Sequence, residues 1–199
     1  LYNRMKCELD LRNIIRDAVC SNQKGALMFI DLDDFKHIND GLGHQYGDLL
    51  LQQIAAGLQG IPGLRGHCYR MGGDEFVVIV KPEQFIGISK IIKNVVALFN
   101  RPWYLRGTEY FCTMSMGVAT FPDNSDDVHE IVKMADMAMY DAKRSGKNRY
   151  NFYDRSKNHN TVQRLDIENN MRQAVASQIH EFVVFYPVSY THLRAHETE

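Results

Sequence analysis

The feature that most constrains the fold of this 199-residue sequence is a short apolar run that ends in acids. Ala26 to Ile30 is unbroken and apolar, and Asp31-Leu32-Asp33-Asp34 follows it directly. A run of this length without alternation is typical of a strand that is buried on both faces. Such a strand requires helices on both sides of its sheet, so we expect an α/β or α+β fold with mixed strand directions. The acids are then expected where this strand meets the next helix.

The spacing of apolar residues predicts the other elements. A three-to-four spacing, typical of amphipathic helices, recurs over residues 4–20, 46–58, 85–99 and 128–142. Two short strands are expected on either side of the Gly72-Gly73 turn. Tyr110 to Val118 alternates between large apolar and small polar residues, which predicts a strand with one polar face.

Composition excludes several classes of partner and site. Lys plus Arg is 23 and Asp plus Glu is 24, so the net charge of −1 gives no global attraction to nucleic acid or to an anionic membrane. No apolar run approaches the roughly 18 residues of a transmembrane helix. The four cysteines lie far apart, which disfavours a structural zinc site or a disulfide framework and predicts a reducing, cytoplasmic compartment. Because the chain begins at Leu1, we interpret it as a fragment whose parent protein is either cytoplasmic or membrane-anchored.

Two acidic clusters carry candidate chemistry, and each has a purely structural alternative. In the structural alternative, Asp33 or Asp34 is the N-cap of the next helix. In the functional alternative, a carboxylate such as Asp31 at a strand end is a rigidly held oxygen ligand for a Mg²⁺ ion that also binds the phosphates of a substrate. Asp74 and Glu75 follow two glycines that suit an ordinary turn, and the acids would then simply face water. Adjacent carboxylates repel each other unless a cation lies nearby, so these acids and Asp31 also suit one or two divalent metals.

A basic cluster follows the last predicted helix. Lys143 and Lys147 flank Gly146, and a basic helix end before a glycine is favoured by the helix dipole alone. The functional alternative is that both ammonium groups contact the outer phosphates of a nucleotide.

These clusters belong to a longer series of blocks. In order, the blocks are Asp31-Leu32-Asp33-Asp34-Phe35-Lys36-His37-Ile38-Asn39-Asp40, Gly43-His44, Gly47-Asp48, Gly72-Gly73-Asp74-Glu75-Phe76, Ser115-Met116-Gly117-Val118-Ala119, Ala142-Lys143 and Gly146-Lys147-Asn148. In order and spacing the series resembles the GGDEF family of diguanylate cyclases, from residue 1 to about residue 154. In one position it departs from the family, because Lys147 stands where an arginine is usual, which keeps the charge and loses the bidentate fork.

The resemblance implies a fold and a reaction. The fold would be that of nucleotidyl cyclases and polymerase palms, with a central mixed β-sheet flanked by helices. The reaction would join two GTP molecules into cyclic di-GMP with release of two pyrophosphates, and Mg²⁺ or Mn²⁺ would be the cofactor. Each subunit would hold one GTP, so a two-fold homodimer would be needed for turnover.

The resemblance also implies roles for individual residues. The catalytic residues would be Asp31, Asp74 and Glu75, and the metal would be held by Asp31, Asp74, Glu75 and the Leu32 carbonyl. The GTP-binding residues would be Asn39, Asp48, Lys36, Phe35, Gly72, Gly73, Lys143 and Lys147. Among these, Asn39 and Asp48 would bind the guanine edge, and the lysines would bind phosphates. Glu75 and metal-bound water both remain candidates for the general base.

We divide the chain into three parts. Residues 1–155 are the GGDEF domain without its start, residues 156–188 resemble a linker helix and the first strand of a truncated EAL phosphodiesterase domain, and residues 189–199 are an unassigned tail that we interpret as a cloning or sequencing artefact. The parent protein would then carry a sensory domain upstream and an EAL domain downstream. Two alternatives stay open: a catalytically weak GTP-binding module that regulates the EAL domain, and a cyclase that also uses ATP, against which Asp48 argues.

Overall fold

Strand β1 (Gly25–Leu32) is the centre of the sheet in the computed structural model, which describes residues 1–157. All eight of its residues are buried. It pairs antiparallel with β3 (Glu75–Val80) on one side and with β6 (Met114–Phe121) on the other. The prediction of a strand covered on both faces is therefore confirmed.

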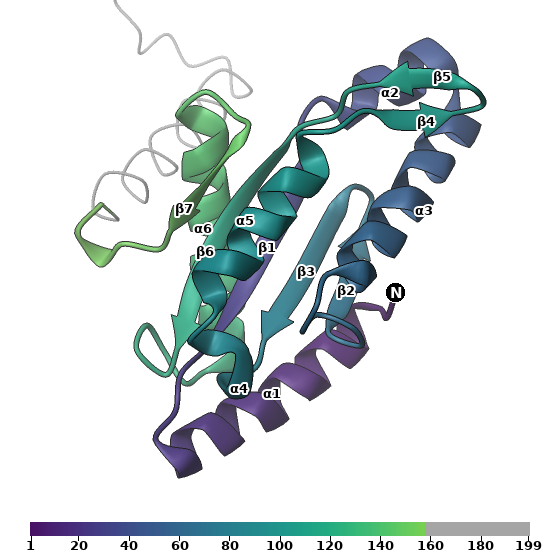
Figure 1. Cartoon of the computed structure of the whole chain (residues 1–199). Coiled ribbons are helices and arrows are strands. Elements are labelled where there is room, and N and C mark those ends of the chain that lie inside the picture. The colour runs from purple at the N-terminus through teal and green to yellow at the C-terminus, as the bar shows by residue number, and fades with distance from the viewer. Residues whose placement is uncertain (158–199) are drawn as a thin grey trace, which may run out of the picture. The chain divides into compact units, whose positions relative to one another are not determined.

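The sheet has five strands in the order β2-β3-β1-β6-β7. Strands β2 (Cys68–Gly72) and β7 (Arg149–Phe152) are its edges, and the β6–β7 pair is the parallel one in a sheet whose other pairs are antiparallel. Helices lie on both sides of this sheet (Figure 1). The expected fold class, a mixed central sheet flanked by helices, is confirmed.

Each face of the sheet is covered by its own helices. Buried residues of α1 (Arg4–Ser21) and α6 (Val128–Arg144) form one hydrophobic cluster with the sheet. Buried residues of α3 (His44–Gly60) and α5 (Ile88–Phe99) form the other, and α2 (Phe35–Leu42) packs on α3.

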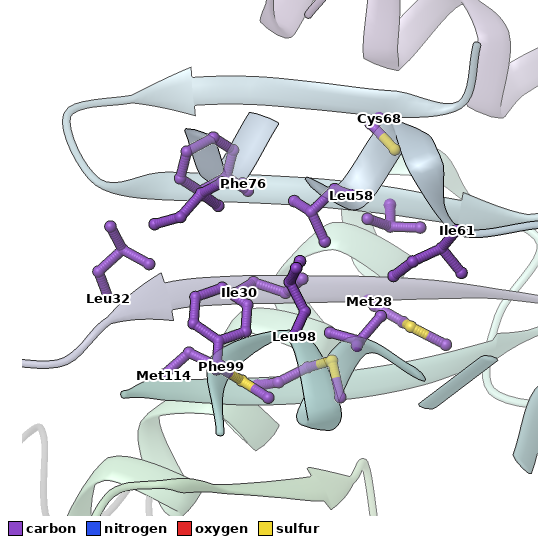
Figure 2. Close-up of a cluster of buried hydrophobic side chains, with 14 of the residues drawn as sticks. Met28, Ile30, Leu32, Leu58, Ile61, Cys68, Phe76, Leu98, Phe99 and Met114 are labelled. Carbon is purple, nitrogen blue, oxygen red and sulfur yellow. The ribbon is translucent and has the colours of Figure 1, made fainter. Parts of the chain in front are cut away.

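Alternation along β1 assigns side chains to the two clusters. Met28 and Ile30 lie in the α3/α5 cluster, where Figure 2 shows them beside Leu98 and Phe99 of α5. Leu27 and Phe29, which alternate with them along the strand, lie in the α1/α6 cluster. Each large apolar side chain buried in this way stabilises the fold by about 1.5–3 kcal/mol relative to an exposed position.

Strand β6 differs from the prediction of a half-polar strand. Ser115 is fully buried and Gly117 lies against α6, so both faces of β6 are covered. The cause is α6, which packs along the face that carries the small residues. A serine and a glycine occupy this face because the helix backbone comes close, so the polar face that the alternation predicts is buried beneath α6.

Two expected boundaries were also wrong. The single strand expected over 110–118 is divided: β5 (Thr108–Tyr110) pairs with β4 (Trp103–Leu105) in a separate hairpin, and β6 begins at Met114. The helix expected over 85–99 begins at Ile88, because α4 (Pro82–Phe85) forms its own short turn before Gly87.

The chain divides into two compact units, Leu1–Asp154 and Arg155–Glu199. Of the second unit only the 3-10 helix η1 (Arg155–Lys157) is described. The predicted start of an EAL domain over 156–188, beyond its first two positions, and the predicted tail over 189–199 lie outside the described residues. Among the helices of residues 1–157, none has the length and apolar character that crossing a bilayer requires.

The close contact at Gly117 generates a test of the packing. A Cβ at this position would overlap the Ala135 carbonyl oxygen and the Met139 backbone nitrogen of α6. Because backbone atoms cannot move aside as a side chain can, we expect Gly117→Ala to lower the free energy of unfolding by about 2–3 kcal/mol. Urea denaturation followed by circular dichroism measures this value.

The matched control is Gly41→Ala in α2, where an added Cβ meets no atom within 4 Å. Alanine is the better helix former by about 1 kcal/mol, so this variant should be neutral or slightly more stable. A Gly117→Ala protein as stable as the Gly41→Ala protein would contradict the packing of α6 on β6.

Candidate functional site

Asp31 stands at the end of β1, next to acids of the neighbouring strand. It is directly opposite Glu75 of β3 and Ser115 of β6 in the two antiparallel ladders. Residues directly opposite each other share one face of a sheet, so these three side chains belong to the α1/α6 face. Asp31 is only 6% exposed, which holds its carboxylate rigidly, as predicted for a strand end.

Burial and charge perturb the acidity of Asp31. The pKa of Asp31 is raised from 3.8 to about 6, with desolvation as the first cause and repulsion by nearby Asp74 and Glu75 as smaller contributions. The opposing influence is Lys143 of α6, whose Nζ lies 2.7 Å from Asp31 Oδ1. One ammonium therefore faces three carboxylates, and the cluster favours additional positive charge.

Glu75 has a second acidic neighbour that sequence reasoning missed. Glu75 and Asp136 both line a pocket of about 270 Å³ between α1, the sheet and α6. Burial is the first cause that raises the pKa of Glu75, and repulsion by Asp136 is the second. Burial likewise raises the pKa of Asp136. The signal in the sequence was helical spacing, because Asp136 lies seven residues before Lys143 and so on the same face of α6.

The donor set of this cluster fits a hard divalent cation. Asp31, Asp74 and Glu75 offer carboxylate oxygens, and Leu32, the last residue of β1, offers its carbonyl. Mg²⁺ prefers such oxygen ligands. Among residues 1–157, no group of three or more His, Cys, Asp or Glu side chains is arranged so that it could hold a metal ion. Ligation by these residues stays a prediction.

The Gly72-Gly73 turn joins β2 to β3, as predicted. Gly72 pairs with Glu75, and Gly73 has the left-handed φ of 49° that glycine adopts without strain. Arg70 holds this turn, because its Nε and Nη2 both donate to the Gly73 carbonyl oxygen at 3.0 and 2.7 Å. Nothing lies within 4 Å of a Cβ built on either glycine, so the turn borders open space that a ligand can approach. No motif in the sequence pointed to Arg70.

The predicted base-binding residues lie on the other face of the sheet, on α2 and α3. The side-chain oxygen of Asn39 rests directly on Gly47, where any Cβ would overlap it. Phe35 is 8% exposed and packs against the same glycine as part of the α3/α5 cluster, and its predicted contact with GTP stays a prediction. Asp48 is exposed and lines a pocket of about 300 Å³ with Arg70 and Phe76. Lys36 is exposed on α2.

The candidate site therefore lies around one end of the sheet. Phe76 lines the pocket with Asp48, whereas Glu75, the preceding residue, faces the α1/α6 side. Consecutive residues of a strand point to opposite faces, and this places the candidate base-binding and metal-binding residues on different sides of the same strand ends.

The helix-cap alternative for Asp33 and Asp34 is wrong. Asp34 occupies the N-cap position of α2 without a side-chain capping bond, and its Oδ1 instead accepts from Lys147 Nζ at 2.7 Å. That contact is the first cause that lowers the pKa of Asp34. Asp33 is 7% exposed and bonds to β6 and to the loop after α6. Two of the three predicted phosphate-binding lysines thus pair with acids in or just after β1: Lys143 with Asp31 and Lys147 with Asp34.

Comparison with known proteins adds to this geometry. The family model described as "Diguanylate cyclase, GGDEF domain" matches residues 1–149. The bifunctional diguanylate cyclase/cyclic di-GMP phosphodiesterase MucR of Pseudomonas aeruginosa is 33% identical over 175 residues, which cover 88% of this chain and 26% of that protein. The chain thus spans about a quarter of the length of that relative.

Solved structures are similar over the same region. The crystal structure of the GGDEF domain of TpbB (YfiN) from Pseudomonas aeruginosa has a TM-score of 0.72 and 35% identity, and the match covers 77% of this chain and 97% of that chain. The active GGEEF domain of a diguanylate cyclase from Vibrio cholerae has a TM-score of 0.69 and 29% identity, covering 78% and 99% of the two chains.

The raised pKa of Asp31 generates a prediction on stability. In the folded chain the Asp31 carboxyl stays protonated up to about pH 6, whereas in the unfolded chain it loses its proton near pH 3.8. The stabilisation from that proton is fully present below pH 3.8 and is lost as the pH rises through about 6. We expect Asp31→Asn, in metal-free buffer, to raise the free energy of unfolding by up to roughly 3 kcal/mol at about pH 8 and to leave it unchanged at about pH 4. Urea denaturation at both pH values measures the difference.

Asp34→Asn is the matched control, because the pKa of Asp34 is lowered by Lys147. Its stabilising charge is present at neutral pH and is lost in acid, so the control should shift stability in the opposite direction at about pH 8. Equal stability of Asp31→Asn and the unaltered chain at about pH 8 would show that Asp31 is not desolvated as described.

Proposed function

The chain belongs to the GGDEF domain family, and from this premise we propose that it is a diguanylate cyclase, which condenses two GTP molecules into cyclic di-GMP and releases two pyrophosphates. The observation that carries the proposal is that a desolvated Asp31 lies directly opposite Glu75 at the end of β1. Lys143 of α6 forms an ion pair with this Asp31. Buried carboxylates at one strand end are what a metal-dependent nucleotidyl transfer needs.

The substrate would lie around the strand ends. Asn39 and Asp48 would bind the guanine edge on the α3 side, because an amide and a carboxylate together match its donors and acceptor. The Gly72-Gly73 turn would lie against the nucleotide between the two faces. Lys143 and Lys147 would bind the phosphates on the α6 side, and Lys36 is a further candidate on α2.

Lys143 would change partners when the nucleotide binds. Its ammonium now compensates Asp31 at 2.7 Å. A cation bound by Asp31, Asp74, Glu75 and the Leu32 carbonyl would take over that compensation, and the ammonium would be released to donate to a phosphate oxygen. The donor set suits Mg²⁺ or Mn²⁺. When bound, such an ion lowers the pKa of the attacking ribose 3′-hydroxyl and balances charge on the leaving pyrophosphate.

Turnover would need two copies of the chain. Cyclic di-GMP contains two nucleotides joined head to tail, and each chain offers one set of base-binding and phosphate-binding residues. A two-fold homodimer would bring two such sets together, so that each 3′-hydroxyl attacks the α-phosphate held by the partner. A monomer would bind GTP without making product.

The setting of the chain is also part of this proposal. The chain would work in the cytoplasm, where GTP is available, and its four cysteines, all free in this structure, are compatible with a reducing compartment. We propose, as in the expectation from sequence, that the parent protein has a sensory domain upstream and an EAL domain downstream.

A second candidate function has support in the relatives. NbdA of Pseudomonas aeruginosa, which is 32% identical over 150 residues, is named as a cyclic di-GMP phosphodiesterase only, so this region also resembles part of a protein named for hydrolysis alone. The chain would then bind GTP and regulate a downstream EAL domain without making product. GTP-stimulated phosphodiesterase activity of the full-length parent, in the absence of any cyclase activity, would favour this function over the first.

The first prediction concerns product. Incubation of the chain with GTP and Mg²⁺, at a protein concentration high enough for weak dimers to form by mass action, should yield cyclic di-GMP and pyrophosphate. Glu75→Gln should lower the rate at least about 100-fold, because it removes a charge that would stabilise the transition state through the metal. Chromatography of the nucleotides measures both.

The control is Glu83→Gln, the same change in an exposed residue beyond the other end of β3. Its rate should equal that of the unaltered chain. Absence of product from the unaltered chain at every protein concentration, with GTP still bound, would refute the cyclase and leave the regulatory module.

The second prediction concerns the base. Asp48→Ala should weaken GTP binding about tenfold while ATP binding stays the same, since a hydrogen bond to a charged group contributes about 1.5–3 kcal/mol. Competition between the two nucleotides measures the ratio. Asp40→Ala removes the same charge from an exposed site on α2 outside the pocket and should leave the ratio intact. An unchanged ratio in Asp48→Ala would show that Asp48 does not read the base.

A further inference from the structure

Asp33 accepts three hydrogen bonds from distant parts of the chain. Its Oδ1 accepts from Ser115 Oγ at 2.7 Å, and its Oδ2 accepts from Thr113 Oγ1 at 2.8 Å and from the backbone N–H of Asn148 at 3.0 Å. Ser115 lies in β6, Thr113 immediately precedes β6, and Asn148 immediately precedes β7. The carboxylate is 7% exposed, and both of its oxygens are already engaged in protein hydrogen bonds.

The backbone that Asp33 holds is in a conformation that needs support. Lys147 and Asn148 have left-handed φ angles of 57° and 48°, directly after Gly146. Residues other than glycine adopt this region only where the surroundings hold them there. The Asn148 N–H is the donor to Asp33 Oδ2, so one hydrogen bond acts on this corner itself.

A second contact joins the same two segments. Lys147 Nζ lies 2.7 Å from Asp34 Oδ1, and Asp34 also has a left-handed φ of 57°. The corner at Asp33 and Asp34, after β1, is thus tied twice to the corner at Lys147 and Asn148, after α6. The bond from the Asn148 N–H to buried Asp33 is partly shielded from water, whereas the Lys147 contact is exposed and therefore weak by itself.

We propose that Asp33 is a positioning residue that fixes the corner between α6 and β7 and thereby sets the place of Lys143 beside Asp31 and of Lys147 beside Asp34. Lys143 is in the last turn of α6 and Lys147 is in the corner, so both ammonium groups depend on where this corner lies. The proposal rests on the proposed function, in which these lysines bind the phosphates of GTP.

The chemistry of the three donors distinguishes this role from metal ligation. An asparagine at position 33 can place its oxygen where Oδ2 accepts from Thr113 and Asn148, and its NH₂ can donate to the Ser115 hydroxyl, which accepts as well as donates. Asp33→Asn therefore preserves the three contacts and removes the charge. A metal ligand would lose most of its affinity by the same change, whereas a positioning residue would not.

The experiment compares Asp33→Asn with Asp33→Ala in the full chain. Asp33→Ala should raise the KM for GTP and the Kd for Mg²⁺-GTP about tenfold, in the range seen when supporting contacts of a site are removed, with a smaller change in kcat. Asp33→Asn should stay within about twofold of the unaltered chain in all three values. A purely structural role would reduce the folded fraction, and so kcat, at unchanged KM.

Amide hydrogen exchange at Asn148 gives a readout that needs no turnover. Exchange of this N–H should be about tenfold faster in Asp33→Ala and unchanged in Asp33→Asn, because only alanine removes the acceptor. Should Asp33→Ala fail to fold, Ser115→Ala and Thr113→Val each remove one supporting donor, and both should speed the same exchange to a smaller extent.

Two results would overturn the proposal. One is an Asp33→Asn protein as impaired as Asp33→Ala in binding Mg²⁺-GTP, which would make Asp33 a ligand of the metal. The other is unchanged exchange at Asn148 in every variant. If the unaltered chain makes no cyclic di-GMP, the proposed cyclase fails, yet Mg²⁺-GTP binding and Asn148 exchange still decide the role of Asp33.

Discussion

The structure depends on a strand that has no free edge and no free face. Each residue of β1 is buried, hydrogen-bonded neighbours lie on both sides, and helices cover both faces. Polar side chains can therefore enter this strand only at its end, and there they stay close to the core. Asp31 and Asp33 are held in that position, and the segments that carry the lysines pack against them. The site is thus rigid because the strand beneath it is the most constrained part of the sheet.

The electrostatic state of the site follows from the same burial. An acid as enclosed as Asp31 is destabilising when ionised, and its neighbours Asp74 and Glu75 add repulsion. Only Lys143 offsets this among the causes that act on Asp31. Residues that lower the stability of a fold in this way are typical of functional sites, where the missing compensation is supplied by a ligand. The nearby left-handed residues Asp34 and Lys147 add backbone strain in the same place.

Much of the fold was predictable from local patterns. The unbroken apolar run at Ala26 to Ile30, the helical spacings and the glycine turn each depend on neighbouring residues alone, and each was confirmed. The prediction of one polar face on β6 did not include its burial, because the contact of Ser115 and Gly117 with α6 is a tertiary feature. Asp33 was interpreted as a helix cap for the same reason: its partners Ser115 and Asn148 are more than 80 positions away, and no local pattern shows them.

The sequence by itself determined the alternation along β1, and with it which side chains share a face with Asp31, because the two-residue period of a strand is a local property. It also determined the family, through blocks whose order survives without any knowledge of contacts. Only the tertiary structure decided how the acids are used. It paired Lys143 with Asp31, and it engaged both carboxylate oxygens of Asp33 in hydrogen bonds with protein donors. It also placed Asp48 and Glu75 in pockets on opposite faces of the sheet. The contacts of Asp31, Asp33 and Asp34 depend on α6 packing on the sheet and on β7 pairing with β6, which bring together residues over 100 positions apart in the chain.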